Sequence, residues 1–297
     1  MKTISPIGIE SVTYGVEDLI AGGRFFEDFG LTPAENGRAG KTYLTKEQTS
    51  IHLRLSGDPA LPRPIESGPT IREVVWAVRS KADLDAIAGE LAKDREVFMG
   101  ADDILYSTDP NGLVIGFQVT RRHEIPDTPP EHRTVNLRAK FYDRGQPEHI
   151  AHVVFFTPNL QENVSFYTER LGFLLSDTLT GLGVFMRCSS DHHNLFLVNH
   201  ARKGLNHVSF RLKDFDEIMA GKEFLEKNGW RPVWGPGRHV IGSNIFYYFA
   251  NPCGAYVEYY ADMDCIMNPD AWTAREWPPG PESLATWGPP IPEEFLR

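Results

Sequence analysis

The chain has 297 residues, of which 41% are hydrophobic and 24% are charged, as in a soluble globular protein with room for about two domains. The net charge of -10 argues against nucleic-acid binding, and no apolar run reaches the roughly 18 residues of a membrane span. The three cysteines form no Cys-x-x-Cys pair and the N-terminus lacks an apolar signal region, so we expect a reducing, cytoplasmic location.

The first predicted elements are a strand and a helix that occur again later in the chain. Residues 9–31, IESVTYGVEDLIAGGRFFEDFGL, read as an apolar strand, a short turn and a helix ending at Gly30. Residues 150–173, IAHVVFFTPNLQENVSFYTERLGF, repeat this order with one residue of gap. The glycine near each end, Gly30 or Gly172, is the residue that a left-handed helix C-cap favours.

A second pair of segments, residues 71–92 and 205–225, again leads from a strand into a helix. Each is followed by a hairpin-like stretch and an Asp/Asn-Pro-x-Gly turn, in DPNGLVIGFQVT at 109–120 and in NPCGAYVEYYAD at 251–262. Such self-similarity indicates duplication. A unit of one strand, one helix and about three strands is therefore predicted four times, near 8–55, 70–120, 149–199 and 205–262.

The predicted fold class is α+β, with four βαβββ modules paired into two domains. We expect an N-terminal domain over residues 1–135 and a second domain over 136–262, joined by a polar, proline-containing stretch. Residues 263–297 form a Pro- and Trp-rich arm. Because tryptophan buries a large apolar area, this arm should lie over the body, and its three tryptophans should cover the mouth of a pocket: Trp272, Trp277 and Trp287.

The two halves differ at three equivalent strand positions. The first half has Ser11, Glu73 and Gly116 where the second half has His152, His207 and Glu258. Side chains alternate between the two faces of a strand. Strict alternation would place Ile150 on the face of His152. It would likewise place Leu205 on the face of His207.

Two imidazoles and one carboxylate that converge form a ligand set that binds Fe(II) and leaves coordination sites open. A lone histidine in a strand is more often a hydrogen-bonded core residue. Three such groups at matching repeat positions, all absent from the first half, favour the metal interpretation. Two histidines and a glutamate also bind zinc, so these residues alone leave the metal open.

The most specific pattern is GRHVIGSNIFYYFANPCGAYVE at 237–258. It contains Gly-x-His, an apolar residue, a tyrosine, an Asn-Pro-x-Gly turn and the glutamate. Together with the paired repeats, it resembles the two-domain type I extradiol ring-cleavage dioxygenases of the vicinal oxygen chelate superfamily. Tyr247 departs from the pattern, where an aliphatic residue or phenylalanine is usual. The resemblance extends to about Asp262 and does not include the arm.

This resemblance implies that three residues are Fe(II) ligands, with Mn(II) as an alternative: His152, His207 and Glu258. It implies that His193, in FMRCSSDHHNLFL, stands beside the bound oxygen and acts as a general acid. His239 and Tyr248 would orient the substrate and help to deprotonate it. The adjacent His192 is expected at the surface or in a structural role, facing away from His193.

The implied reaction is ring cleavage of a small vicinal dihydroxy aromatic by O2, with no organic cofactor, in a homo-oligomer. Trp234 and Phe185 would wall the ring, and three arginines are considered as partners of an anionic substituent: Arg211, Arg231 and Arg238. One alternative is a glyoxalase-like isomerase or transferase of the same superfamily, and another is a metal-free ligand-binding member. The isomerase or transferase does not need His193, His239 and Tyr248, and the intact set of three ligands argues against the metal-free member.

Overall fold

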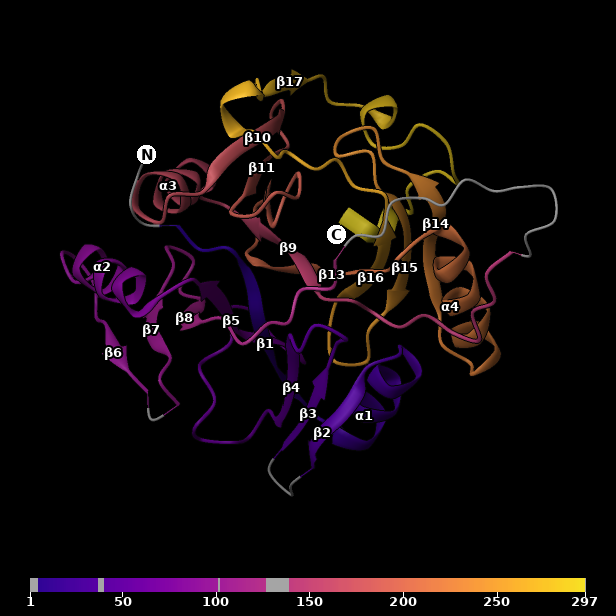
Figure 1. The fold of residues 1–297 in the computed structure, drawn as a ribbon, viewed down its shortest axis with the longest axis horizontal. Helices are drawn as coiled ribbons and strands as arrows, with labels where there is room; N and C mark the ends of the chain where they lie inside the picture. Colours follow the sequence, from indigo (N-terminus) through magenta and orange to yellow (C-terminus); the bar gives the residue numbers. More distant parts are fainter. Residues whose placement is uncertain (1–4, 37–39, 101, 127–138, 297) are drawn as a thin grey trace.

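The computed structural model describes residues 5–36, 40–100, 102–126 and 139–296 (Figure 1). Its described part is an α+β fold in which the order strand, helix, strand, strand, strand occurs four times, as predicted. The predicted boundary between residues 135 and 136 lies outside the described residues. The division of the chain into the three stated domains therefore stays a prediction.

The first two modules form one eight-stranded sheet in the order β2-β3-β4-β1-β5-β8-β7-β6. The leading strands β1 and β5 pair antiparallel at its centre, and each leading strand also pairs in parallel with the last strand of its own module. The elements are β1 (Gly8–Val16), α1 (Leu19–Asp28), β2 (Thr32–Asn36), β3 (Gly40–Leu44), β4 (Ser50–Leu55), β5 (Thr70–Val78), α2 (Lys81–Leu91), β6 (Phe98–Met99), β7 (Leu105–Thr108) and β8 (Val114–Val119).

The last two modules repeat this arrangement in a nine-stranded sheet, in the order β14-β15-β16-β13-β9-β12-β11-β10-β17. Here α3 continues into a π-helical turn, Phe166–Arg170, which the sequence pattern did not predict. The elements are β9 (Ile150–Thr157), α3 (Leu160–Ser165), β10 (Leu174–Leu179), β11 (Gly183–Arg187), β12 (Leu195–Asn199), β13 (Gly204–Arg211), α4 (Phe215–Lys227), β14 (Pro232–Arg238), β15 (Ile245–Ala250) and β16 (Tyr256–Ala261).

The helix ends follow the local sequence. The Asp18 carboxylate accepts hydrogen bonds from the backbone N–H groups of Ile20 and Ala21 at the start of α1, which satisfies donors that a helix leaves unpaired. Gly30 and Gly172 have φ values of +91° and +74°, so the predicted left-handed caps are confirmed.

The arm crosses the second sheet (Figure 1). Its strand β17 (Arg275–Trp277) pairs in parallel with β10, and a 3-10 helix, Glu293–Leu296, ends the described chain. The arm thus lies over the body, as predicted. All three cysteines are free, and no helix in the described ranges is long and apolar enough to cross a membrane.

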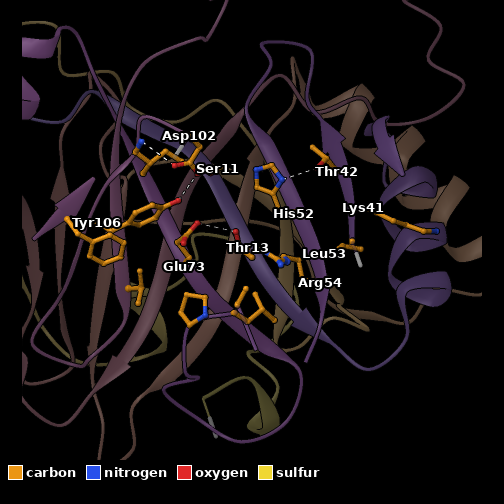
Figure 2. A pocket seen from close by; sticks show the side chains of 17 residues that line it. Ser11, Thr13, Lys41, Thr42, His52, Leu53, Arg54, Glu73, Asp102 and Tyr106 are labelled. Carbon is orange, nitrogen blue, oxygen red and sulfur yellow. Dashed lines mark hydrogen bonds between the residues drawn. The ribbon is translucent and has the colours of Figure 1, made fainter. Parts of the chain in front are cut away.

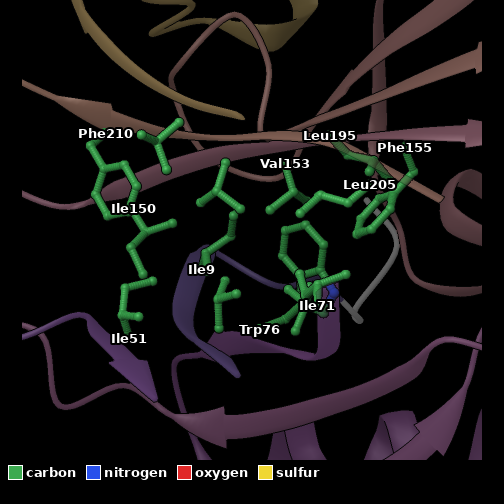
Figure 3. Packing of buried hydrophobic residues seen from close by; sticks show 14 of the residues in the cluster. Ile9, Ile51, Ile71, Trp76, Ile150, Val153, Phe155, Leu195, Leu205 and Phe210 are labelled. Atoms are coloured by element: carbon green, nitrogen blue, oxygen red, sulfur yellow. The ribbon is translucent and has the colours of Figure 1, made fainter. Parts of the chain in front are cut away.

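A continuous hydrophobic core joins the two sheets (Figure 3). Ile9 and Trp76 of the first sheet face Val153 and Phe155 of the second, and all four side chains are almost fully buried. Burial of one such side chain stabilises the fold by roughly 1.5–3 kcal/mol. The core therefore holds the central strands of both sheets in a fixed position, and β9 uses its opposite face for the site described below.

Because of two β-bulges, some side chains of the central strands lie on a different face of the sheet from the one predicted. In the β9–β13 pair the register shifts at Ala151 and again at Asn206. Each extra residue reverses the alternation of the side chains. Ile150 and Leu205 consequently lie in the core between the sheets, and not on the face of His152 and His207 as strict alternation predicts (Figure 3).

The first sheet has the same two irregularities in its β1–β5 pair, one between Ile9 and Ser11 and one between Thr13 and Tyr14. Their extra residues, Glu10 and Arg72, match Ala151 and Asn206 of the second sheet. The bulges are thus part of the duplicated unit.

Candidate metal centre

Three buried polar side chains meet on the second sheet. His152 lies on β9, His207 on β13 and Glu258 on β16, and their relative exposures are 1%, 5% and 0%. Each offers one ligand atom, and these atoms lie within 4.8 Å of one another. The structure thus brings together the three residues that the repeat comparison singled out.

Strand register explains why they converge. On β13, Ser209 stands opposite His152 on β9 and opposite Glu258 on β16. His207 is two residues before Ser209 and projects from the same face of the same strand. The first sheet has the same register, with Val75 opposite Ser11 and Gly116. The predicted equivalence of the positions is therefore confirmed.

The donor atoms of this cluster suit a bound cation. His152 Nε2 lies 2.9 Å and His207 Nε2 3.4 Å from Oε2 of Glu258, and the two Nε2 atoms are 3.3 Å apart. These are short ion-pair distances, yet Oε2 makes no hydrogen bond of acceptable geometry. A buried carboxylate oxygen without a hydrogen bond is costly. A metal ion would satisfy this oxygen together with both nitrogens, so the residues fit a divalent metal.

The charge states of these groups also suit metal binding. Burial alone would raise the pKa of Glu258, but His152 and His207 hold it well below its usual value. Burial lowers the pKa of His207 to about 4, against the opposing influence of Glu258. Ionised carboxylate and neutral imidazole are the forms that bind metals.

Asn206, the bulge residue, orients His207. Its Oδ1 lies 2.6 Å from His207 Nδ1, and its Nδ2 donates to the backbone carbonyl of Phe295 at 2.7 Å. An acceptor on Nδ1 keeps the proton there and leaves Nε2 free for a metal. The sequence analysis missed Asn206, although its position directly before a predicted ligand was a signal.

The three other predicted site residues border the same pocket. His193 is 4% exposed, and its ring centre is 4.3 Å from that of His152. Burial and the neighbouring histidines, His152 first, lower its pKa well below the usual value. His193 is therefore a neutral imidazole beside the ligand cluster.

His239 and Tyr248 form a hydrogen-bonded pair on β15 and the loop before it. His239 Nδ1 lies 2.7 Å from the carbonyl oxygen of Leu284, so Nδ1 carries the proton and donates. The neutral ring then accepts the Tyr248 hydroxyl proton on Nε2, at 3.1 Å. Burial, and next the charge of Glu258, raises the pKa of Tyr248 well above its usual value, so its hydroxyl stays protonated.

The prediction for His192 was wrong in part. This residue is fully buried, and its Nδ1 lies 3.1 Å from Nδ1 of His193. His192 and His193 lie in the loop before β12, where the alternation of side chains along a strand does not apply. Its side chain therefore contacts His193 and is not at the surface.

The pocket around these groups is mostly apolar. Phe185 and Trp234 line it, as predicted. The arm closes it with Leu284, Ile291 and Phe295, and not with the predicted tryptophans. Of those tryptophans, Trp272, Trp277 and Trp287, the first two hydrogen-bond to β10 and the third is 43% exposed.

No lysine or arginine of the described residues lines this pocket. The three arginines considered for an anionic substituent make ion pairs elsewhere. Arg211 pairs with Glu148, Arg231 with Glu294 and Arg238 with Asp262.

A larger pocket, about 740 Å³, lies over the first sheet (Figure 2). Ser11 and Glu73 line it, and Glu73 accepts a 3.3 Å hydrogen bond from Thr13. A Cβ atom on Gly116 would lie 2.8 Å from Cγ2 of Ile104, so a glutamate there would require Ile104 to shift. At the three equivalent positions the first sheet thus has one carboxylate, whereas the second sheet has three converging metal-ligand groups. The larger of the two pockets is therefore not the one that fits a metal.

Known proteins resemble this chain along most of its length. A family model described as the glyoxalase/bleomycin resistance protein/dioxygenase superfamily matches residues 149–259. Metapyrocatechase 2 of Cupriavidus necator is 39% identical over 97% of this chain and 91% of its own length. The 3-methylcatechol 2,3-dioxygenase of Pseudomonas putida is 28% identical, over 63% of this chain and 60% of its own.

The fold is also found in solved structures. The Mn(II)-bound glyoxalase from Novosphingobium aromaticivorans superimposes with a TM-score of 0.81 at 26% identity, covering 99% of this chain and 95% of its own. Because the sequence match to metapyrocatechase 2 extends over nearly all of both chains, this chain belongs to the glyoxalase/bleomycin resistance protein/dioxygenase superfamily, also called the vicinal oxygen chelate superfamily, and within it to the extradiol dioxygenases.

Proposed function

We propose that the protein opens the aromatic ring of an uncharged catechol-type diol with O2, at a metal held by His152, His207 and Glu258. One observation carries this proposal: His193 and the His239–Tyr248 pair border the three-ligand cluster inside a single, mostly apolar pocket. Both the metapyrocatechase and the methylcatechol dioxygenase among its relatives are named for catechol substrates.

The metal would supply a Lewis acid that lowers the pKa of a bound hydroxyl and, if redox-active, a route for electrons to O2. We assign Fe(II), since zinc has no redox chemistry. Mn(II) is the alternative, because a similar solved structure holds it.

The Tyr248–His239 pair would receive the substrate. The Tyr248 oxygen donates its proton to His239 Nε2 and keeps lone pairs that can accept a hydrogen bond from a diol hydroxyl. His239 Nε2 can take up a proton that the diol releases, because its ring becomes an imidazolium whose Nδ1–H still faces the carbonyl of Leu284. The pair thus orients the diol and removes a proton from it.

His193 stands beside the cluster, against His152. A neutral imidazole there can take a proton and return it to oxygen as a general acid. The apolar walls exclude water, which strengthens these hydrogen bonds.

The pocket walls favour an uncharged substrate. A carboxylate on the ring would be buried without a cation to pair with, and burial of an unpaired charge is costly. Catechol or an alkylated catechol therefore fits better than a dihydroxybenzoate.

The test is metal analysis of anaerobically purified protein, combined with oxygen uptake. The panel contains catechol, 4-methylcatechol and, as the anionic control, 3,4-dihydroxybenzoate. We expect about one iron per chain, oxygen uptake matched by a yellow ring-opened product, and much lower kcat/KM for the carboxylate. Bound iron without oxygen uptake on any diol would contradict the proposal. Isomerase activity without oxygen uptake would favour the glyoxalase-like alternative. The homo-oligomeric state and the cytoplasmic location stay predictions.

A further inference from the structure

His193 is connected to a buried chain of polar groups that leads away from the pocket. His192 Nδ1 lies 3.1 Å from His193 Nδ1, and His192 Nε2 lies 3.3 Å from Oδ2 of Asp177 on β10. His192 is 0% and Asp177 2% exposed. Among the described residues, no other group hydrogen-bonds the His193 ring. Its orientation therefore depends on His192.

Asp177 is held as an ionised acceptor. Its Oδ1 accepts the backbone N–H of Arg275 at 2.7 Å, and its Oδ2 accepts the indole N–H of Trp277 at 2.9 Å. Burial would raise the pKa of Asp177, but the hydrogen bonds, that of His192 first, lower it below its usual value. Both donors besides His192 come from the arm strand β17.

The direction of the hydrogen bonds follows from the carboxylate. An ionised carboxylate only accepts, so His192 Nε2 must carry a proton. A neutral ring protonated on Nε2 has an unprotonated Nδ1, so His193 Nδ1 must donate the proton between the two rings. This leaves His193 Nε2 without a proton.

We propose that His192 and Asp177 are positioning residues, which fix His193 in the tautomer whose Nε2 is a bare acceptor. The role of that tautomer in turnover rests on the proposed function, but the tautomer itself does not. Because two donors to Asp177 belong to the arm, docking of the arm and orientation of His193 are coupled through one carboxylate.

Two variants at position 192 separate orientation from packing. His192→Phe keeps a buried ring but has no acceptor for His193. His192→Asn places an amide oxygen near the position of the former Nδ1 and can still accept that proton. A third variant, Asp177→Asn, has one amide oxygen in place of two carboxylate oxygens for three donors, His192, Arg275 and Trp277, so it removes the constraint that the carboxylate places on the His192 ring. Thermal unfolding of each variant confirms that it is folded.

The decisive measurement is the nitrogen-15 NMR spectrum of histidine-labelled, metal-free full-length protein, with His193→Gln used for assignment. We expect the Nδ1–H tautomer of His193 in the wild type and in His192→Asn. A shift toward Nε2–H is expected in His192→Phe and in Asp177→Asn. An unchanged His193 tautomer in both of these variants overturns the proposal, whatever the activity.

Kinetics provide the second measurement. In His192→Phe we expect kcat to fall roughly 10- to 100-fold with little change in KM for the diol, since a positioning residue contributes part of the 10²–10⁴-fold effect of a proton-transfer group. In His192→Asn most of kcat should return. A rise in KM with unchanged kcat would overturn the positioning role. Failure of the wild type to consume O2 with any diol would contradict the proposed function, but the tautomer of His193 found by NMR would still stand.

Discussion

Single side chains decide the chemistry of two otherwise matching sheets. Ser11 and Glu73 occupy the strand positions of His152 and His207, in the same register. A serine and one carboxylate in an open pocket offer far weaker metal binding than two imidazoles around a buried carboxylate. The difference between the halves therefore lies in residue identity and not in backbone geometry.

This comparison gives a matched pair of variants. His152→Ala should lower metal affinity more than about 100-fold, because even loss of a group that only supports a ligand costs 10- to 100-fold. Oxygen uptake should fall with metal content. Glu73→Ala, at the equivalent site of the first sheet, should leave both unchanged. Metal titration of the two purified proteins checks this, and equal metal loss in both would show that the first sheet also binds.

Glu73 also makes stability depend on pH. Burial raises its pKa to about 7, and Asp102 adds to this while the hydrogen bond from Thr13 opposes it. In the unfolded chain its pKa returns to 4.5. Between these values the folded state holds a proton that the unfolded state has lost. The stabilisation is therefore present below pH 4.5 and lost as the pH rises through 7.

The variant Glu73→Gln tests whether ionisation of Glu73 lowers stability as the pH rises. The variant cannot ionise at position 73, so its free energy of unfolding should fall less than that of the wild type between pH 4.5 and 7.5. Urea unfolding at intervals across this range measures the difference. Parallel curves for the two proteins would mean that Glu73 has its ordinary pKa in the folded state.

Among the elements, the bulges and the arm shape the site most. The extra residue Asn206 turns His207 toward the pocket and ties its Nδ1 to the arm through the carbonyl of Phe295. Phe295 itself is 5% exposed and packs against Tyr248 and Tyr256, with ring centres 4.8 and 5.1 Å away. A short terminal helix thus closes the pocket and supports a predicted ligand.

The variant Phe295→Ala should open the pocket on the side that the arm covers. The arm end can detach without unfolding either sheet, so we expect KM for catechol to rise about tenfold, equal to ~1.4 kcal/mol, with little change in Tm. The control is Met267→Ala, an arm residue that is 81% exposed and should have no effect. Steady-state kinetics and thermal unfolding measure both. A large decrease in Tm with unchanged KM would show that the arm end stabilises the fold and does not form a wall of the pocket.

At the scale of the whole molecule, the two sheets share one core. Phe29 of the first half stacks on Tyr259 of the second with ring centres 4.1 Å apart, and the Tyr259 hydroxyl donates to the Phe29 carbonyl at 2.8 Å. The hydrophobic cluster that contains them runs through both sheets without a break. Neither half can therefore be removed without exposing a large apolar face.

We expect one cooperative thermal transition for the full chain. A fragment of residues 139–297, which contains every predicted ligand, should bind a hydrophobic dye and unfold at lower temperature, because its contacts to Phe29 and Trp76 are lost. Calorimetry and dye binding measure this. A fragment that is monomeric, binds no dye and has the Tm of the full chain would contradict a shared core.

Much of this molecule is determined by sequence alone. The duplicated strand–helix pattern predicts four modules, and unequal residues at equivalent positions mark out His152, His207 and Glu258. Both inferences depend on neighbours along one strand or on comparison of repeats, and such local information is present in the chain itself. His239 and Tyr248, by contrast, were predicted from the resemblance of residues 237–258 to the motif of a known family.

Tertiary structure alone decided the rest. The bulges, the contact of His192 with Asp177 and the closure of the pocket by Phe295 depend on contacts between residues that are not neighbours in the chain. Asp177 and His192 are 15 residues apart, and Asn206 and Phe295 are 89 apart. No periodicity encodes such pairs, because packing between elements and the need to pair every buried polar group select them only once the sheets have formed.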